Sequence, residues 1–301
     1  MKCLIFGAGG YIGRHLVHEL TTLGHEIVEN RASAASPQRP DLADPSSLQE
    51  VDWAVDCVFA LAGVTGTSSS FTDYAHFIRG NEMTLLNILE AIRHSLHRPR
   101  VVFPSSRLVY MGSDVPLSET ALKEARTIYA ANKISCELYL RAYSNAFDIP
   151  HTVFRVCVPY GNTRSDQYSF GTMGNFISQA MSTRRIRLYG DGESRRSFTY
   201  IDDLCRAIIQ GSVDPRCQNE TFNLPGENLS LRQAADLIAV SLGATVESAE
   251  WPLLDLQIES GSTVFDSSKL ASLLDFKDMM RVADWAGMLS PRAEDSAGTS
   301  R

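Results

Sequence analysis

The sequence lacks the features of several classes of protein. No apolar run in its 301 residues is long enough for a membrane span, and the N-terminal "MKCLIF" is too short for a signal peptide. Lysine and arginine number 28 against 35 aspartates and glutamates, so the net charge is −7 and general nucleic-acid binding is not expected. We therefore expect a cytoplasmic protein that binds neither membranes nor nucleic acids.

The cysteines and histidines show none of the spacings that are typical of metal sites. The six cysteines form no CxxC pair, and the seven histidines show no HExxH or similar spacing. Reduced, buried thiols in a cytosolic protein are the expected state, and we predict no metal site. No histidine stands out as a catalytic base.

Strand-like and helix-like segments alternate along the first half of the chain. Apolar runs predict strands at 2–6, 26–30, 57–63, 100–106 and 151–156, and helical patterns occupy 13–24, 44–51, 81–96 and 129–147. This alternation predicts an α/β fold, a doubly wound parallel-sheet Rossmann domain over residues 1–156. From 157 to 290 the chain is richer in Gly, Arg and Tyr, which indicates a smaller, discontinuous substrate-binding lobe with some segments returning to the first domain. We expect residues 291–301 to be a disordered tail.

A glycine-rich loop follows the first predicted strand. "GAGGYIG" places Gly7 at a tight turn, Gly10 where a pyrophosphate approaches the backbone, and Gly13 where the helix packs closely on the strand. A glycine triplet alone is weak evidence for nucleotide binding, but its position between a predicted strand and a predicted helix predicts a dinucleotide-binding site.

A possible acid/base group lies farther along. "YAANK" places Tyr129 and Lys133 one helical turn apart, so both project from one face. A nearby ammonium favours the phenolate of tyrosine, and such a pair can move a proton while hydride passes to a nicotinamide. Ser106, after the strand at 100–106, offers a hydroxyl to the same reacting oxygen.

These motifs, in this order, resemble the extended short-chain dehydrogenase/reductase family, which contains nucleotide-sugar epimerases, dehydratases and reductases. The resemblance runs from Met1 to about Trp285 and includes "GAGGYIGRHLV", "ALAG", "GNEMTLLNILEA", "SSRLVY", "YAANK", "FRVCVPYGN" and "LYGDGESRRSFTYIDDL". It implies that Tyr129 is the acid/base, that Ser106 is its hydrogen-bonding partner, and that Lys133 binds the nicotinamide ribose.

The resemblance also implies the remaining contacts of the site. A nucleoside-diphosphate sugar would be the substrate, with its diphosphate on Arg196, and the family implies a homodimer through the helices at 81–96 and 129–147. One departure is Val158, where the family often has Asn. The cofactor residues would be Gly7, Gly10, Tyr11, Ile12, Gly13, Arg31, Asp41, Leu42, Leu61, Ala62 and Lys133, and the substrate residues Ser105, Arg107, Tyr160, Asn175 and Arg196.

The residues around Ser106 limit which reactions of this family the chain can catalyse. Dehydratases of this family usually carry an Asp-Glu pair after the active-site hydroxyl residue, whereas this chain has Arg107 and Leu108. Epimerisation at C3 or C5 would need a further acid/base pair, and Cys157 has no plausible histidine partner. Two reactions need only serine, tyrosine and lysine: reduction of a 4-keto sugar nucleotide by NADPH, and 4-epimerisation on tightly bound NAD.

Arg31 favours the NADPH-dependent reduction over the 4-epimerisation. The acidic ribose-binding position at the end of the second strand falls on Arg31, and an arginine there can pair with the 2′-phosphate of NADP. Glu29, two residues earlier, is an alternative ribose ligand. We therefore predict an NADPH-dependent reductase of a nucleoside-diphosphate 4-keto-6-deoxysugar, made for a cell-surface glycan such as O-antigen. A 4-epimerase with NAD is the alternative, and an inactive nucleotide-binding regulator ranks third.

Overall fold

The central layer of the protein is a parallel sheet. The computed structural model describes residues 1–28, 41–162 and 169–289, and within these ranges six strands pair in the order β2-β1-β3-β4-β5-β9. The predicted doubly wound parallel sheet is confirmed. Its strands are β1 (Lys2–Phe6), β2 (Glu26–Val28), β3 (Cys57–Ala60), β4 (Arg100–Ser106), β5 (His151–Val156) and β9 (Glu220–Asn223).

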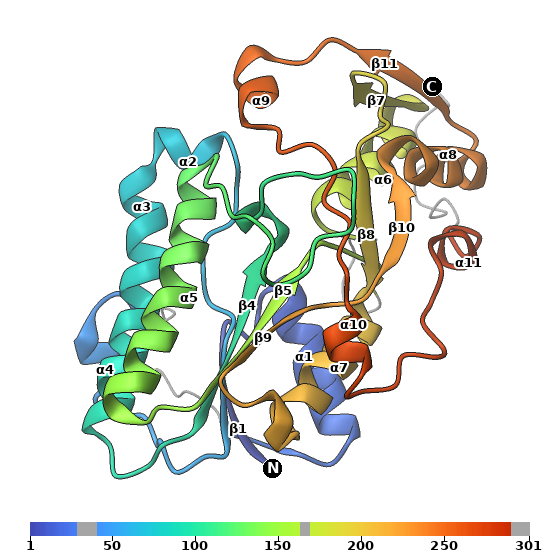
Figure 1. Ribbon diagram of the computed structural model, residues 1–301. Coiled ribbons are helices and arrows are strands. Elements are labelled where there is room, and N and C mark those ends of the chain that lie inside the picture. Colours follow the sequence, from blue (N-terminus) through green and yellow to red (C-terminus); the bar gives the residue numbers. More distant parts are fainter. Residues whose placement is uncertain (29–40, 163–168, 290–301) are drawn as a thin grey trace, which may run out of the picture.

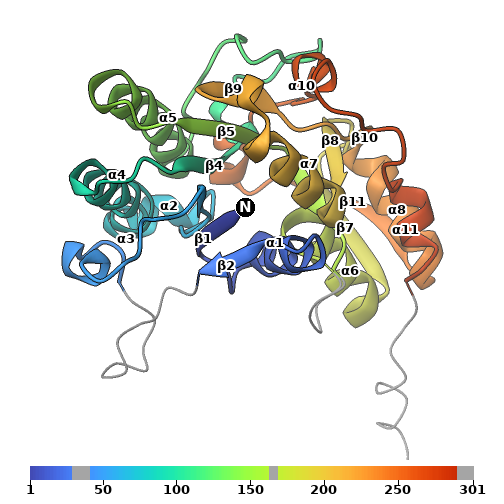
Figure 2. The ribbon, with the colours of Figure 1, turned by 90° about the horizontal axis from the view of Figure 1, so that it is seen from below.

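Helices cover both faces of this sheet (Figures 1 and 2). Successive side chains of a strand point to opposite faces, so Cys3 and Ile5 of β1 pack in one core and Leu4 and Phe6 in the other. The first core contains side chains of α1 (Tyr11–Thr22) and α7 (Ile201–Val213), and the second those of α4 (Thr84–His94) and α5 (Ile128–Phe147). Strands buried on both faces explain the continuous apolar runs of the sequence.

Several predicted elements have different limits in the structure. The expected helix at 44–51 is a short 3₁₀ turn, η1 (Pro45–Leu48), because Leu48 is its one buried side chain and offers too little apolar surface for a longer helix. Asp44 does cap this turn, accepting a hydrogen bond from the amide of Ser46 at 3.0 Å. The helix predicted from residue 81 begins earlier, as a π-helical turn, η2 (Arg79–Met83), that leads directly into α4.

A second lobe is built from small sheets and helices. In it β6 (Val158–Tyr160) and β10 (Glu227–Ser230) flank β8 (Arg195–Tyr200), while β7 (Arg185–Tyr189) pairs with β11 (Thr245–Ala249). Their core packs against α6 (Gly171–Thr183), α8 (Leu231–Leu242) and α11 (Val282–Ala286). Because α7 and β9 belong to the first layer, the chain passes between the two parts more than once (Figure 1). The shorter elements are α2 (Ser69–Thr72), α3 (Tyr74–Ile78), η3 (Arg107–Val109), η4 (Pro215–Cys217), α9 (Leu253–Ile258) and α10 (Ser268–Ala271).

This topology places the candidate motifs together. β1, β3 and β4 are neighbours in the sheet and run parallel, so their carboxyl ends meet at one edge. The glycine loop follows β1, Leu61 and Ala62 follow β3, and Ser106 ends β4. Ligands of open α/β sheets bind at this edge. Within the described ranges, no helix is long and apolar enough to cross a membrane.

Candidate active site

The glycine loop is packed too tightly for side chains at two of its positions. Gly7 has φ +91°, and a Cβ on it would lie 2.6 Å from the amide nitrogen of Ala62 and 2.7 Å from the carbonyl carbon of Leu61. A Cβ on Gly13 would lie 2.1 Å from the carbonyl oxygen of Gly7. The loop therefore lies directly against Leu61 and Ala62, as a dinucleotide-binding turn requires.

The first turn of α1 suits a pyrophosphate. Gly10 caps the helix without a side-chain hydrogen bond, is itself exposed, and is followed by no acidic residue in that turn. The amides at the start of a helix have no partner within it and carry a partial positive charge, so they attract anions. Tyr11 stacks on Phe170 with ring centroids 5.5 Å apart, and Ile12 packs on the core between α1 and the sheet. These residues fit a dinucleotide.

The expected adenosine contacts are only partly described. Asp41 is exposed and pairs with Arg79 at 2.6 Å, and this hydrogen bond lowers the pKa of the Asp41 carboxyl. Leu42 packs on the core, and its carbonyl accepts a hydrogen bond from Asn87 at 3.0 Å. Arg31 and Glu29 lie outside the described residues.

Ser106, Tyr129 and Lys133 come together where β4 meets the start of α5. All three side chains are buried, and Ser106 hydrogen bonds with the phenol of Tyr129. The ammonium of Lys133 donates to the carbonyl of Pro104 at 2.8 Å and lies 5.8 Å from the centre of the Tyr129 ring. The three predicted catalytic residues are thus neighbours.

Burial controls the protonation of this set. It raises the pKa of Tyr129 to about 12, although the hydrogen bond from Ser106 acts in the opposite direction. It also lowers the pKa of Lys133 to about 8. The expected stabilisation of the phenolate by the ammonium is therefore outweighed by loss of solvent, and without ligands Tyr129 is protonated at neutral pH. In this state Tyr129 is a proton donor.

Ser105 points away from this group and into a buried polar network. Its hydroxyl donates to Oε1 of Glu137 at 2.6 Å, and the same carboxylate takes two hydrogen bonds from Arg155, at 2.9 and 2.6 Å. Arg155 also donates to the hydroxyl of Tyr110, which donates in turn to Asn223. Ser105 is committed to the protein, and this network fixes the strand end that carries Ser106.

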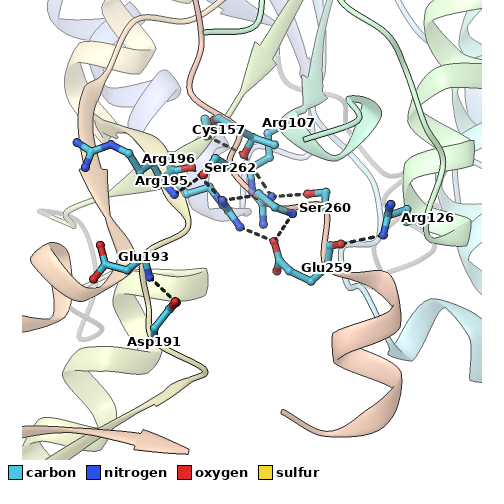
Figure 3. A network of polar contacts seen from close by, with 12 residues as sticks. Arg107, Arg126, Cys157, Asp191, Glu193, Arg195, Arg196, Glu259, Ser260 and Ser262 are labelled. Atoms are coloured by element: carbon cyan, nitrogen blue, oxygen red, sulfur yellow. Dashed lines mark hydrogen bonds and ion pairs between the residues drawn. The ribbon is translucent and has the colours of Figure 1, made fainter. Parts of the chain in front are cut away.

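The Arg196 side chain is also hydrogen bonded to protein groups. It is 1% exposed, and its Nη2 donates to Oε1 of Glu259 at 2.6 Å (Figure 3). Its Nη1 donates to the carbonyls of Arg195 and Gly261. Glu259 begins a segment, residues 259–266, that hydrogen bonds with β8 on one side and with residues 113–117 on the other. Arg196 therefore fastens this segment to the second lobe.

Arg107 lies beside Arg196 but has weaker partners. Its Nη1 is 3.3 Å from the hydroxyl of Ser260 and 3.4 Å from that of Thr263. Figure 3 shows the two arginines side by side, with Arg107 bonded to Ser260 and Arg196 to Glu259. Burial, and after it the charge of Arg107, lower the pKa of Arg196 to about 10. Cys157 is buried next to the cluster, with its thiol donating to the carbonyl of Thr263 at 3.2 Å.

The last two predicted substrate residues, Tyr160 and Asn175, lie in different surroundings. Tyr160 is fully buried, with its hydroxyl on the carbonyl of Met280 and its ring against Trp285, so it belongs to the core of the second lobe. Asn175 lines a pocket of about 530 Å³ at the edge of that lobe. The other lining residues are Gln179, Arg187, Tyr189, Ala249 and Glu250, and Tyr189 packs against Trp251 with ring centroids 5.2 Å apart.

Two residues of the site were not expected from the sequence. Glu137 lies four residues after Lys133 on α5, and this spacing, continued from Tyr129, was the available signal. Glu259 carries no local signal, because only the fold brings it to Arg196. Metal chemistry has no candidate site either, since no three His, Cys, Asp or Glu side chains gather anywhere in the described part of the chain.

Comparison with known proteins agrees with this geometry. The sequence model of the NAD dependent epimerase/dehydratase family matches residues 3–224. An uncharacterized UDP-glucose epimerase of Bacillus subtilis is 28% identical over 94% of this chain and 95% of its own. A UDP-N-acetyl-α-D-glucosaminuronate decarboxylase of Bacillus cytotoxicus is 30% identical over 75% of each. The solved UDP-glucuronic acid 4-epimerase of Bacillus cereus, in complex with UDP-glucuronic acid and NAD, superimposes with a TM-score of 0.79 at 24% identity, over 95% of this chain and 96% of that one.

Proposed function

Because the chain belongs to the NAD dependent epimerase/dehydratase family, we propose that it is a nucleoside-diphosphate-sugar 4-epimerase that uses bound NAD. The observation that carries this proposal is the composition of the site. Ser106, Tyr129 and Lys133 form one proton-transfer group beside a dinucleotide loop, and Arg107 and Leu108 stand where a second acid and base would be needed for dehydration. This set can move one proton at a hydroxyl oxygen, while a bound nicotinamide would exchange one hydride at the carbon that carries it.

Each residue of the set has a defined task in that reaction. The chemistry that a bound nicotinamide would supply is removal of the hydride of the sugar C4 and its return to the opposite face of that carbon, which inverts C4. Tyr129 would take the proton of the 4-hydroxyl and give it back to the 4-keto oxygen, with Ser106 holding that oxygen by a hydrogen bond. Tyr129 must release its proton to solvent before the sugar binds, and a charged Lys133 favours that loss. Burial of both groups keeps water from the reacting oxygen.

The known relatives favour epimerisation over the reductase predicted from the sequence. Their printed names describe epimerases of UDP-sugars and a decarboxylase of a UDP-sugar acid, and none of the three reported above is a 4-keto reductase. The prediction of NADPH, a 4-keto-6-deoxysugar and a role in O-antigen synthesis rested on Arg31, which the structure does not describe. We therefore place NADPH-dependent reduction second.

The nucleoside of the substrate has a suitable place in the pocket around Asn175. Tyr189 and Trp251 offer aromatic surface for a base, and Asn175 and Gln179 offer amide groups near it. The pocket lies in the second lobe, while Tyr129 lies at the sheet edge of the first. We propose that the nucleoside occupies the pocket and the sugar reaches Tyr129.

A direct experiment separates the two candidates. Purified protein is incubated with UDP-glucose, UDP-glucuronate or their C4 epimers, with and without added NAD, and the products are followed by NMR. A 4-epimerase interconverts one such pair without any external reductant. Consumption of NADPH by a 4-keto-6-deoxy sugar nucleotide, with no interconversion of the epimers, would instead establish the reductase.

The expected homodimer is also part of the proposal. Ile78, Met83 and Leu138 are partly exposed apolar side chains on α3, η2 and α5, and these elements pack against one another. We propose that these side chains contribute to the dimer interface, which the family resemblance places at the helices nearby. Light scattering should give twice the 33.2 kDa chain mass, and Leu138→Lys should shift the protein to the monomer.

A further inference from the structure

The cluster of Arg107, Arg196 and Glu259 has more positive than negative charge. Arg196 and Glu259 neutralise each other at 2.6 Å, and the described residues place no carboxylate within ion-pair distance of Arg107. Arg107 is half-buried, and its charge is felt by Arg196 and by the buried thiol of Cys157. A guanidinium in this setting has lost part of its hydration without gaining an anion.

The hydrogen bonds of the two arginines show which of them is available. Arg196 uses Nη1 on two carbonyls and Nη2 on Glu259, so a ligand would have to displace parts of the protein to reach those atoms. Among the described residues, Arg107 has as side-chain partners only the hydroxyls of Ser260 and Thr263, at 3.3 and 3.4 Å, which are long for hydrogen bonds to a guanidinium. Arg107 is the arginine of this cluster that is ready to take an anion.

The position of Arg107 in the chain indicates which anion. Arg107 directly follows Ser106, so its Cα is about 3.8 Å from that of the residue that holds the reacting oxygen. In a hexopyranose that reacts at C4, the neighbouring C5 carries the exocyclic C6 group. The diphosphate is attached to C1, across the ring, and leads away toward the nucleoside. The group nearest to C4 that can carry a negative charge is a carboxylate at C6.

We propose that Arg107 binds the C6 carboxylate of a nucleoside-diphosphate hexuronate and selects this substrate over the neutral hexose. The proposal rests on the function given above and names the substrate class of the same site. A carboxylate accepts two charge-assisted hydrogen bonds from a guanidinium and supplies the missing negative charge. A neutral hydroxymethyl group would leave Arg107 uncompensated, and a site built around a polar contact rejects analogues that lack it.

Binding of two matched ligands tests this inference. UDP-glucuronate and UDP-glucose differ only at C6, and UDP alone reports the nucleotide contacts. Calorimetry is carried out with the wild type, Arg107→Met, Arg107→Lys and the control Arg195→Met. Arg195 neighbours the cluster in the chain but bonds with Asn228 instead. We expect the wild type to bind UDP-glucuronate at least about tenfold more tightly than UDP-glucose.

The Arg107 variants should change the affinity for UDP-glucuronate without changing that for UDP-glucose or UDP. Arg107→Met should weaken UDP-glucuronate at least about tenfold and leave UDP-glucose and UDP nearly unchanged, Arg107→Lys should retain part of the preference, and Arg195→Met all of it. Equal weakening of all three ligands by Arg107→Met would place Arg107 on the diphosphate and overturn the inference. Equal affinity of the wild type for both sugars would overturn it as well. Thermal melting of each variant excludes loss of fold as the cause.

Product analysis keeps this inference separate from the proposed function. If UDP-glucuronate binds with the expected dependence on Arg107 but gives no C4 epimer, the 4-epimerase proposal fails while the assignment of Arg107 stands. Release of CO₂ and formation of a UDP-pentose would be one such result. If UDP-glucose is epimerised and UDP-glucuronate is neither bound nor converted, the function stands and the assignment of Arg107 fails.

Discussion

The carboxylate of Glu137 and the guanidinium of Arg155 form a bidentate ion pair beneath the strand end that carries Ser106. Nε and Nη2 of Arg155 donate to the two carboxylate oxygens at 2.9 and 2.6 Å, and Ser105 donates to one of them. Arg155 is 2% exposed. The pair links α5, which carries Tyr129 and Lys133, to β4 and β5, so it joins the two elements of the catalytic set.

Removal of one partner should be costly. Glu137→Gln leaves the Arg155 guanidinium buried without its counterion, and we expect a loss of about 3–5 kcal/mol in the free energy of unfolding. Urea denaturation followed by circular dichroism measures it. Asp275→Asn, which breaks the exposed pair with Lys277, is the control and should leave the midpoint unchanged. Equal midpoints for the wild type and Glu137→Gln would show that the buried pair is dispensable.

Tyr129→Phe should lower turnover by orders of magnitude but leave binding intact. The substitution keeps the ring, which is 9% exposed, and deletes only the hydroxyl that carries the proton. Loss of general acid/base catalysis lowers rates by roughly 10²–10⁴-fold, and NAD affinity should be nearly unchanged. Steady-state kinetics and calorimetry measure the two effects. Tyr143→Phe is the control, because Tyr143 lies farther along α5 and its hydroxyl donates to Glu90 of α4. Retained turnover in Tyr129→Phe would assign the proton transfer to another residue.

The sequence predicted the parts of the site that depend on local spacing. A glycine triplet such as Gly7, Gly10 and Gly13 predicts a tight loop where a strand precedes a helix. Tyr129 and Lys133 share a helix face because they are one helical turn apart. Apolar runs located the central strands for the same reason, since burial on both faces leaves a continuous signal. Short elements such as η1 were less predictable because few residues determine them.

Contacts between distant segments could not be predicted in this way. Ser105, Tyr160 and Arg196 are predicted to touch substrate, and the fold gives each of them hydrogen bonds to protein groups far away in the sequence, such as that of Arg196 with Glu259. The protonation of Tyr129 is a similar case. Proximity to Lys133 predicts a lowered pKa, but the degree of burial, which raises it, appears only in the folded chain.

Gly13→Ala should damage the dinucleotide site. The new Cβ would lie 2.1 Å from the carbonyl oxygen of Gly7, so the loop must move away from α1. We expect NAD affinity to fall at least about tenfold, because the amides that face the pyrophosphate move with the loop. Calorimetric titration with NAD measures the change. Gly287→Ala, where the nearest atom to the new Cβ is 3.5 Å away, is the control. Unchanged NAD affinity in Gly13→Ala would contradict this account of the loop.

His151 should make the protein sensitive to mild acid. The imidazole is 5% exposed at the start of β5, and its Nδ1 has no hydrogen-bond partner in the described part of the chain. Burial lowers its pKa from 6.5 to about 4. Between pH 6.5 and 4 the unfolded chain therefore binds a proton that the native protein does not, so stability falls as the pH falls through this window.

The size of this effect follows from the same shift. Each pKa unit corresponds to about 1.4 kcal/mol, so His151 removes up to about 3 kcal/mol between pH 7 and pH 4. His151→Gln cannot take up the proton and should have a flatter dependence of unfolding free energy on pH across this range. Urea denaturation at half-unit intervals of pH measures both curves. Since other groups also titrate there, the difference between the two curves is the test, and parallel curves would show that His151 is protonated equally in the folded and unfolded chain.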